Sequence, residues 1–270
     1  MQGIHKFIPT TLKSRYINQL LKVGFDTIDF GSFVSPKAIP QMRDSAEVLK
    51  SLDLNGSTRL LAIVANRRGA LDASSFEEIT YLGYPFSISE TFQMRNTNAT
   101  IEESLQRVDE IQQICLQSGK KLVAYLSMGF GNPYGDPWNV DIVQKWVDIL
   151  AHKEIRILAL SDTIGVSTPE SIKYLFGNLI PPYPDVEFGA HLHTTPNSWR
   201  SKVEAAYESG CRRFDSTIKG YGGCPMAKDE LTGNMATENL LSYLDDHSIP
   251  HNIDRTEFNH ATKIALQVFS

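Results

Sequence analysis

The sequence has few of the features that mark secreted, membrane-bound or nucleic-acid-binding proteins. It contains three cysteines, Cys115, Cys211 and Cys224, an odd number with spacings that fit neither a disulfide framework nor a zinc site. No apolar run approaches the roughly 18 residues of a membrane span, and residues 1–10 lack the basic start and apolar core of a secretory signal. A net charge of −5 gives no basic excess for nucleic acid. We therefore predict a cytoplasmic protein that binds neither nucleic acid nor membrane.

The composition that remains is typical of a soluble globular protein. Hydrophobic residues make up 41% of the 270 positions and charged residues 21%, enough apolar material for a large core. Barrels of about 250 residues commonly form one domain. We expect a single catalytic domain over residues 1–270.

Short apolar, β-rich runs alternate with longer amphipathic stretches along the chain, the pattern of repeated βα units. The predicted strands are Phe25–Phe30, Thr58–Ala65, Tyr84–Ser89, Lys121–Ser127, Ile155–Leu160, Val186–His191 and Arg213–Ser216. The predicted helices are Ser14–Val23, Thr100–Ser118, Val140–Ala151, Pro169–Leu175, Ser198–Ser209 and Thr237–Leu244. Thr100 with Glu103 forms a capping-box sequence, and Thr168 precedes a proline suited to the first helical position. Glycines at the expected helix ends are Gly24, Gly119 and Gly210.

Polar residues follow nearly every predicted strand, which favours a closed barrel over an open doubly wound sheet. They are Asp29, Ser127, Asp162, His191, His193, Thr217 and Lys219. In a barrel all these strand ends meet at one mouth, whereas an open sheet gathers its site at one switch point. A barrel of this type has eight strands, and the chain opens with a loop and a helix. We therefore predict an α/β (β/α)8 TIM barrel that lacks strand 1.

Two imidazoles at the end of one predicted strand are the strongest candidate for a metal site. Alternation along the strand points His191 and His193 to the same side, with Leu192 opposed. Asn234 offers an amide oxygen, and such a mixed shell suits magnesium, manganese or zinc. The alternatives are a core histidine, a loop-capping histidine and a turn asparagine.

Other polar residues near strand ends have both a chemical and a structural interpretation. Asp162 and Asp29 each follow a strand, where either can act as an acid or base, orient a ligand, or form a structural hydrogen bond. Cys224 lies in a glycine-rich loop suited to a lid, although a lone cysteine is also a small apolar residue. Lys219 permits a Schiff-base aldolase only if it is desolvated.

Several motifs, in order along essentially the whole chain, resemble 3-hydroxy-3-methylglutaryl-CoA lyases, which belong to a metal-dependent family of β/α-barrel lyases and synthases. They are Met1–Ile4 with Phe7–Thr10, SFVSPKAIPQM at 32–42, SDTIGVSTP at 161–169, HLH at 191–193, GGCPMA at 222–227 and TGNMATE at 232–238. The resemblance implies retro-Claisen cleavage of 3-hydroxy-3-methylglutaryl-CoA to acetoacetate and acetyl-CoA. It also implies an acyl-CoA substrate and a possible homo-oligomer.

The resemblance further implies the residues of the site. A divalent metal, Mg or Mn, would be held by His191, His193 and Asn234. Cys224, Asp162 and Asp29 would be catalytic. Substrate contacts would come from Ser32, Tyr125 and Lys37.

This sequence departs from the family pattern at positions that affect the site. In the family, an Arg-Asp pair on the first strand comes directly before the Met-Gln-Gly stretch, and supplies a metal ligand and a cation that stabilises the enolate. Here Met1 opens the chain, Asp29 stands in place of a glutamate, and Thr194 in place of an aspartate. A synthase of the same family and a non-catalytic barrel used as a binding protein therefore remain alternatives.

Overall fold

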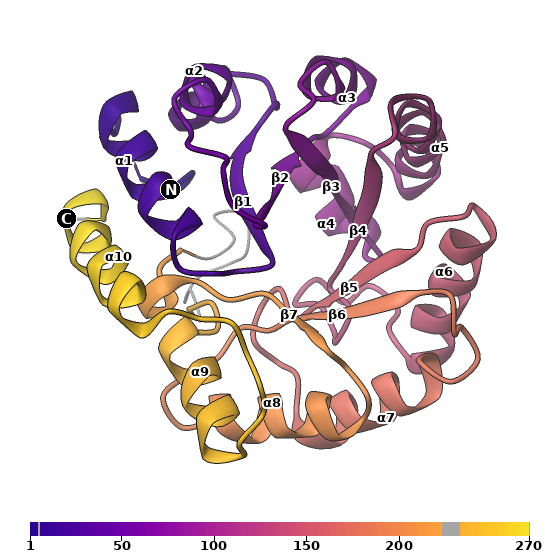
Figure 1. Cartoon of the computed structure of the whole chain (residues 1–270). Coiled ribbons are helices and arrows are strands. Elements are labelled where there is room, and N and C mark those ends of the chain that lie inside the picture. Colours follow the sequence, from indigo (N-terminus) through magenta and orange to yellow (C-terminus); the bar gives the residue numbers. More distant parts are fainter. Residues whose placement is uncertain (5, 223–232, 270) are drawn as a thin grey trace. The chain divides into compact units, whose positions relative to one another are not determined.

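The structure is a computed structural model that describes residues 1–4, 6–222 and 233–269. Strands and helices alternate along the chain (Figure 1). The strands are β1 (Thr27–Ser32), β2 (Arg59–Ile63), β3 (Ile79–Ser87), β4 (Lys121–Ser127), β5 (Ile157–Ser161), β6 (Glu187–His191) and β7 (Arg213–Phe214). They are hydrogen-bonded in chain order in one sheet. The α/β barrel class with seven readable strands, predicted from the sequence, is confirmed.

Helices follow most strands, as the βα pattern requires. The α-helices are α1 (Thr10–Leu21), α2 (Ser45–Leu49), α3 (Arg67–Ser74), α4 (Glu90–Thr97), α5 (Ile101–Ser118), α6 (Val140–His152), α7 (Pro169–Leu179), α8 (Trp199–Glu208), α9 (Thr237–Asp246) and α10 (Arg255–Val268). Short 3-10 turns are η1 (Pro40–Met42) and η2 (Ile218–Gly220). None of the helices in the described part of the chain is long and apolar enough to cross a membrane.

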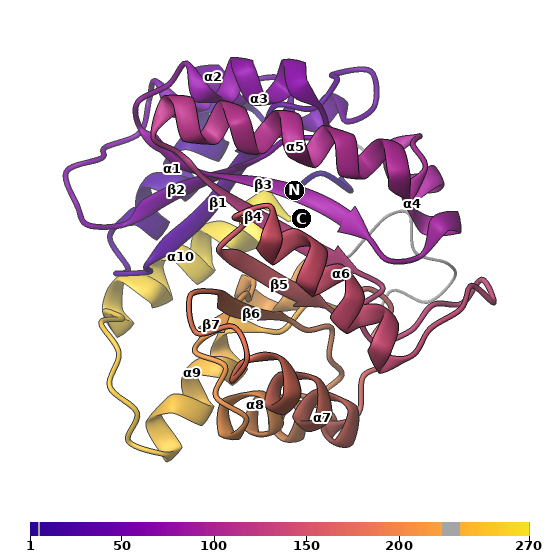
Figure 2. The same cartoon turned by 90° about the vertical axis from the view of Figure 1, so that its right-hand side faces the viewer.

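One compact unit comprises Met1–Gly83, Gln113–Lys121 and Ile249–Ser270. In it β1 pairs in parallel with β2, and β2 with the first part of β3. Helices α2 and α3 cover one face of β1 and β2 (Figures 1 and 2). Its core includes Leu60, Leu61 and Ala62, nearly continuous apolar sequence that is typical of parallel strands covered on both faces.

The other compact unit comprises Tyr84–Gln112 and Leu122–Ser248. Strands β4, β5, β6 and β7 pair in parallel, with Ser161 of β5 opposite His191 of β6. Helices α7 and α8 lie side by side along β5 and β6 (Figure 2). This arrangement places the segments that follow β5 and β6 next to each other.

Hydrogen bonds confirm the helix starts predicted at Thr100 and Thr168. The Glu103 amide donates to Thr100 Oγ1 at 3.1 Å, and the Thr100 amide donates to the Glu103 carboxylate at 2.8 Å. Thr168 caps α7 through the Ser171 amide at 3.2 Å. The sequence prediction omits α2, α3, α4 and α10, which are short or separated from a clear strand signal.

Candidate active site

His191 and His193 lie together where β6 ends. Their ring centroids are 5.7 Å apart, while Leu192 between them is buried in the core. The backbone of His193 forms an antiparallel β-bridge with Asn234. Next to this bridge, the Thr194 amide donates a hydrogen bond to the Gly233 carbonyl at 2.9 Å. The structure therefore brings the three predicted metal ligands next to one another.

The orientation of the His191 ring is set by Asp215, which the sequence analysis did not single out. Asp215 follows β7, and its amide donates to the Ala190 carbonyl at 3.1 Å. Its carboxylate lies 3.0 Å from His191 Nδ1. A carboxylate on Nδ1 fixes the tautomer and directs Nε2 to the opposite side of the ring, the usual arrangement behind a metal-binding histidine. Tyr125 of β4 lies edge-on to the same ring, with centroids 5.7 Å apart.

A hydrogen bond to the backbone orients the side-chain amide of Asn234. Nδ2 donates to the Tyr221 carbonyl at 3.0 Å. An amide has one donor end and one acceptor end, so this bond leaves Oδ1 as the end suited to a cation.

The three side chains fit part of a divalent-metal shell. Among residues 1–4, 6–222 and 233–269, no group of three or more His, Cys, Asp or Glu side chains is arranged to hold a metal ion. Two imidazoles, one of them held by a carboxylate, and an amide oxygen nevertheless form a mixed nitrogen and oxygen donor set. Such a donor set suits a divalent metal.

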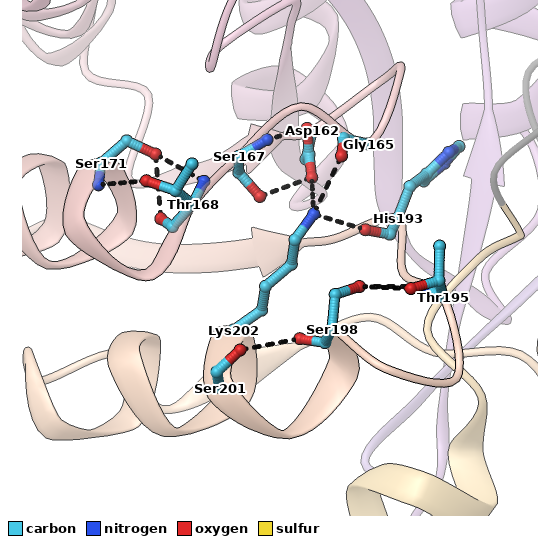
Figure 3. Close-up of polar contacts among 10 residues, drawn as sticks. All are labelled: Asp162, Gly165, Ser167, Thr168, Ser171, His193, Thr195, Ser198, Ser201 and Lys202. Carbon is cyan, nitrogen blue, oxygen red and sulfur yellow. Dashed lines mark hydrogen bonds and ion pairs between the residues drawn. The ribbon is translucent and has the colours of Figure 1, made fainter.

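Asp162 lies directly after β5 and is fully buried, its side chain 0% exposed. One carboxylate oxygen accepts the Ser167 amide at 3.0 Å; the other accepts the Ser167 hydroxyl and the Lys202 ammonium, the latter at 2.7 Å (Figure 3). Gly165 closes the same turn by donating its amide to the Asp162 carbonyl at 3.0 Å. Both oxygens are thus engaged by the protein, which favours the turn-capping interpretation over direct contact with a substrate hydroxyl.

The remaining candidates of the first unit lie on or just after β1. Asp29 is exposed on β1, beside a β-bulge between Asp29 and Gly31. Ser32 ends the strand and is buried, and its hydroxyl donates to the Ile63 carbonyl at 3.3 Å. Lys37 is exposed in the turn that follows. Their roles stay predictions.

The three cysteines differ in what the structure describes. Cys224 lies outside the described residues. Cys115 and Cys211 are free and buried, and burial raises the pKa of each thiol to about 12. A thiol with so high a pKa is unreactive, so both act as packing residues. Lys219 is exposed rather than desolvated, which does not favour a Schiff-base aldolase.

A family model described as HMGL-like matches residues 1–264. The chain belongs to the HMGL-like family. It is 34% identical over 249 residues to the mitochondrial hydroxymethylglutaryl-CoA lyase of Bos taurus, covering 90% of this chain and 74% of that protein. It is 31% identical over 266 residues to the hydroxymethylglutaryl-CoA lyase YngG of Bacillus subtilis, covering 97% and 87%.

Solved structures of HMGL-like proteins share the fold of this chain. The Bacillus subtilis HMG-CoA lyase superposes with a TM-score of 0.92 at 30% identity, over 98% of this chain and 89% of that one. An HMG-CoA lyase from Acinetobacter baumannii, solved in complex with coenzyme A and 3-methylmalate, gives a TM-score of 0.91 at 30% identity, over 99% of this chain and 87% of that one. The resemblance drawn from the motifs is therefore confirmed, and with it the prediction of a carbon–carbon lyase, from a family that depends on divalent metals.

Proposed function

We propose that this protein, as a single catalytic domain, cleaves 3-hydroxy-3-methylglutaryl-CoA to acetoacetate and acetyl-CoA. The observation that carries the proposal is the set of paired imidazoles at the end of β6. His191 is oriented by Asp215, and His193 is bridged to Asn234, in a chain of the HMGL-like family. The coenzyme A bound in a related lyase supports an acyl-CoA substrate.

The reaction breaks the C2–C3 bond of the substrate. The C3 hydroxyl loses its proton and becomes the ketone of acetoacetate, while the bonding electrons pass to C2 as the enolate of the acetyl thioester. A proton added at C2 then completes acetyl-CoA. A divalent metal, Mg or Mn, held by His191, His193 and Asn234, would polarise the substrate oxygens.

The chain's own residues would supply the proton transfers and hold the substrate. Asp29 would accept the C3 hydroxyl proton, and Cys224 would donate a proton to C2. Ser32, Tyr125 and Lys37 would contact the substrate, Lys37 through a carboxylate or a phosphate. Asp162 would orient the segment after β5. A cytoplasmic location and a homo-oligomer complete the proposal.

The proposal is tested by incubating the purified protein with 3-hydroxy-3-methylglutaryl-CoA and Mg²⁺ or Mn²⁺, and measuring both acetyl-CoA and acetoacetate. We expect equimolar products, and loss of activity on chelation. His193→Ala should lower kcat/KM by about 100-fold or more, since it removes a ligand. His152→Ala changes a histidine of the same unit whose side chain is 77% exposed, and should leave the rate unchanged.

Absence of both products with either metal would refute the proposal. An unchanged cleavage rate in Cys224→Ser would refute the assignment of the proton donor alone.

A further inference from the structure

We propose that Lys202 is a positioning residue for the metal site, because its buried ammonium group holds the backbone of His193 in the conformation that presents the imidazole. The inference rests on the proposed function. It concerns a residue whose ammonium group is engaged by protein acceptors and that acts through the chain segment next to it.

All three donors of the Lys202 ammonium are engaged. Nζ donates to Asp162 Oδ2 at 2.7 Å, to the Gly165 carbonyl at 3.1 Å and to the His193 carbonyl at 2.9 Å. The lysine side chain is only 4% exposed. Since an ammonium group has three N–H bonds, this set saturates it, and its geometry is fixed by acceptors from two separate loops.

The contact with His193 is made on the backbone side of the residue. Figure 3 shows the Lys202 ammonium group facing the His193 carbonyl, while the imidazole points away from it. On the next residue, the Thr194 amide donates to the Gly233 carbonyl at 2.9 Å. Both polar groups of the His193–Thr194 peptide unit are thus held, the carbonyl by Lys202 and the amide by the segment that carries Asn234.

A role in stability alone explains this arrangement poorly. Replacing a buried ion pair by apolar side chains of similar volume is often neutral or stabilising, so such a pair is weak support for stability. The lysine here also reaches beyond its aspartate to two backbone carbonyls, one of which belongs to a candidate metal ligand. Positions just outside a metal shell commonly change metal affinity by about 10–100-fold when they are mutated.

The first experiment neutralises both partners, so that no buried charge is left alone. The test variant is the double substitution Lys202→Met/Asp162→Asn. The control is the double substitution Lys13→Met/Asp44→Asn, which removes a second buried lysine–aspartate pair from the other unit. Mn²⁺ affinity of the free protein is measured by calorimetry, and folding by circular dichroism. We expect the Lys202 variant to bind Mn²⁺ about tenfold or more weakly, and the Lys13 variant to bind within about twofold of the wild type.

Steady-state kinetics of the same variants supply a second readout. Because protein acceptors engage all three donors of the Lys202 ammonium group, we expect kcat to fall in its variant while KM for the acyl-CoA changes little at saturating metal. A general loss of stability would lower the amount of active enzyme in both double variants alike.

The second experiment uses the unmodified protein, so that it remains decisive even if the variants fold poorly. Side-chain ammonium resonances of the buried lysines are followed by NMR during Mg²⁺ titration. The Lys202 signal should shift and saturate together with the ring signals of His191 and His193, and the Lys13 signal should not move.

The outcomes separate this inference from the proposed function. If the wild type binds metal and cleaves substrate, but the folded Lys202 double variant binds Mn²⁺ as tightly, or the Lys202 resonance is unmoved by Mg²⁺, the positioning role is wrong and the proposed function stands. If the wild type binds neither Mn²⁺ nor Mg²⁺, both are wrong.

Discussion

Two buried lysine–aspartate pairs, one in each compact unit, share their chemistry but differ in what they hold. In the first unit, Lys13 Nζ lies 2.6 Å from Asp44 and also donates to the Gln41 carbonyl, and it packs over the Phe7 ring at 4.2 Å. Gln41 in turn accepts the Ile8 amide at 2.9 Å. This network therefore joins α1 and the amino-terminal segment to the turn before α2.

The pair in the second unit ends on the candidate site instead. Lys202 joins Asp162 to the carbonyl of His193, a predicted metal ligand. Both lysines are nearly inaccessible, 2% exposed at Lys13 and 4% at Lys202, so burial alone does not distinguish them. They differ in the backbone carbonyl that the lysine also binds, which is that of Gln41 for Lys13 and that of His193 for Lys202. The function of a buried ion pair must therefore be inferred from its contacts rather than from its burial.

The largest effect is expected when one pair loses only its lysine. Lys202→Met leaves Asp162, whose side chain is 0% exposed, without its counter-charge, and should cost about 3–5 kcal/mol of unfolding free energy. Lys13→Met should cost less, about 3 kcal/mol, because Asp44 is 10% exposed and keeps a 2.7 Å hydrogen bond from Thr10. Urea denaturation measures both losses. A greater loss in Lys13→Met would contradict the ranking.

Replacing Asp215 tests whether the orientation of the His191 ring contributes to metal affinity independently of the position of the His193 backbone. Asp215→Asn weakens the hold on His191 Nδ1 but leaves the Lys202 network intact, and should lower Mn²⁺ affinity by about 10–100-fold. Asp246→Asn, an exposed aspartate of the same unit that pairs with Arg200, is the matched control and should change nothing. If Asp215→Asn binds Mn²⁺ like the wild type, the ring of His191 does not depend on this carboxylate.

Sequence could predict the parts of this site that depend on neighbouring residues, but not the contacts between residues far apart in the chain. The like orientation of His191 and His193 is local, because strand alternation alone determines it. The contacts of Asp215 and Lys202 join residues 24 and 40 positions apart, and no periodicity encodes such pairs. A lysine in a predicted amphipathic helix is assigned to the surface unless the tertiary structure is known.

The fold shows the same division between local and distant causes. Strand β4 has the predicted bounds Lys121–Ser127, because its apolar run is nearly uninterrupted. Strand β3 begins at Ile79, five residues before the predicted start, since its register is set by pairing with β2. Helix α10 carries a readable signal that the prediction omits: Asp254 caps it, and buried Phe258, Ala261 and Ile264 recur every three residues.

The buried thiols report on opening of each unit separately, since Cys115 belongs to the first and Cys211 to the second. Neither should react with a disulfide reagent in the native protein, because burial raises both thiol pKa values to about 12. Lys202→Met should speed modification of Cys211 more than that of Cys115, and Lys13→Met the reverse, each by about tenfold. Mass spectrometry after timed labelling identifies the site. Equal acceleration at both thiols would show that the two units open together.

The smallest expected loss of stability concerns Asp136, a carboxylate that accepts hydrogen bonds from hydroxyl and amide donors. Asp136 accepts hydrogen bonds from the Ser89 hydroxyl and from the Thr91 amide and hydroxyl, the last two at 2.9 Å. Burial, the largest single influence, raises the pKa of Asp136, but these bonds together lower it below the ordinary value of 3.8. A lowered pKa in the folded state adds stability above pH 3.8, and that stability is lost as the pH falls through the folded-state pKa.

Asp136→Asn should therefore cost about 1 kcal/mol at pH 7, discounted for partial exposure, and the difference from the wild type should shrink between about pH 5 and pH 3. Urea denaturation across that range measures it. Because the printed donors to Asp136 are hydroxyl and amide groups, the result measures how strongly such donors stabilise a charged carboxylate. A difference that stays constant down to pH 3 would mean that the Asp136 carboxylate is not stabilised in its charged form.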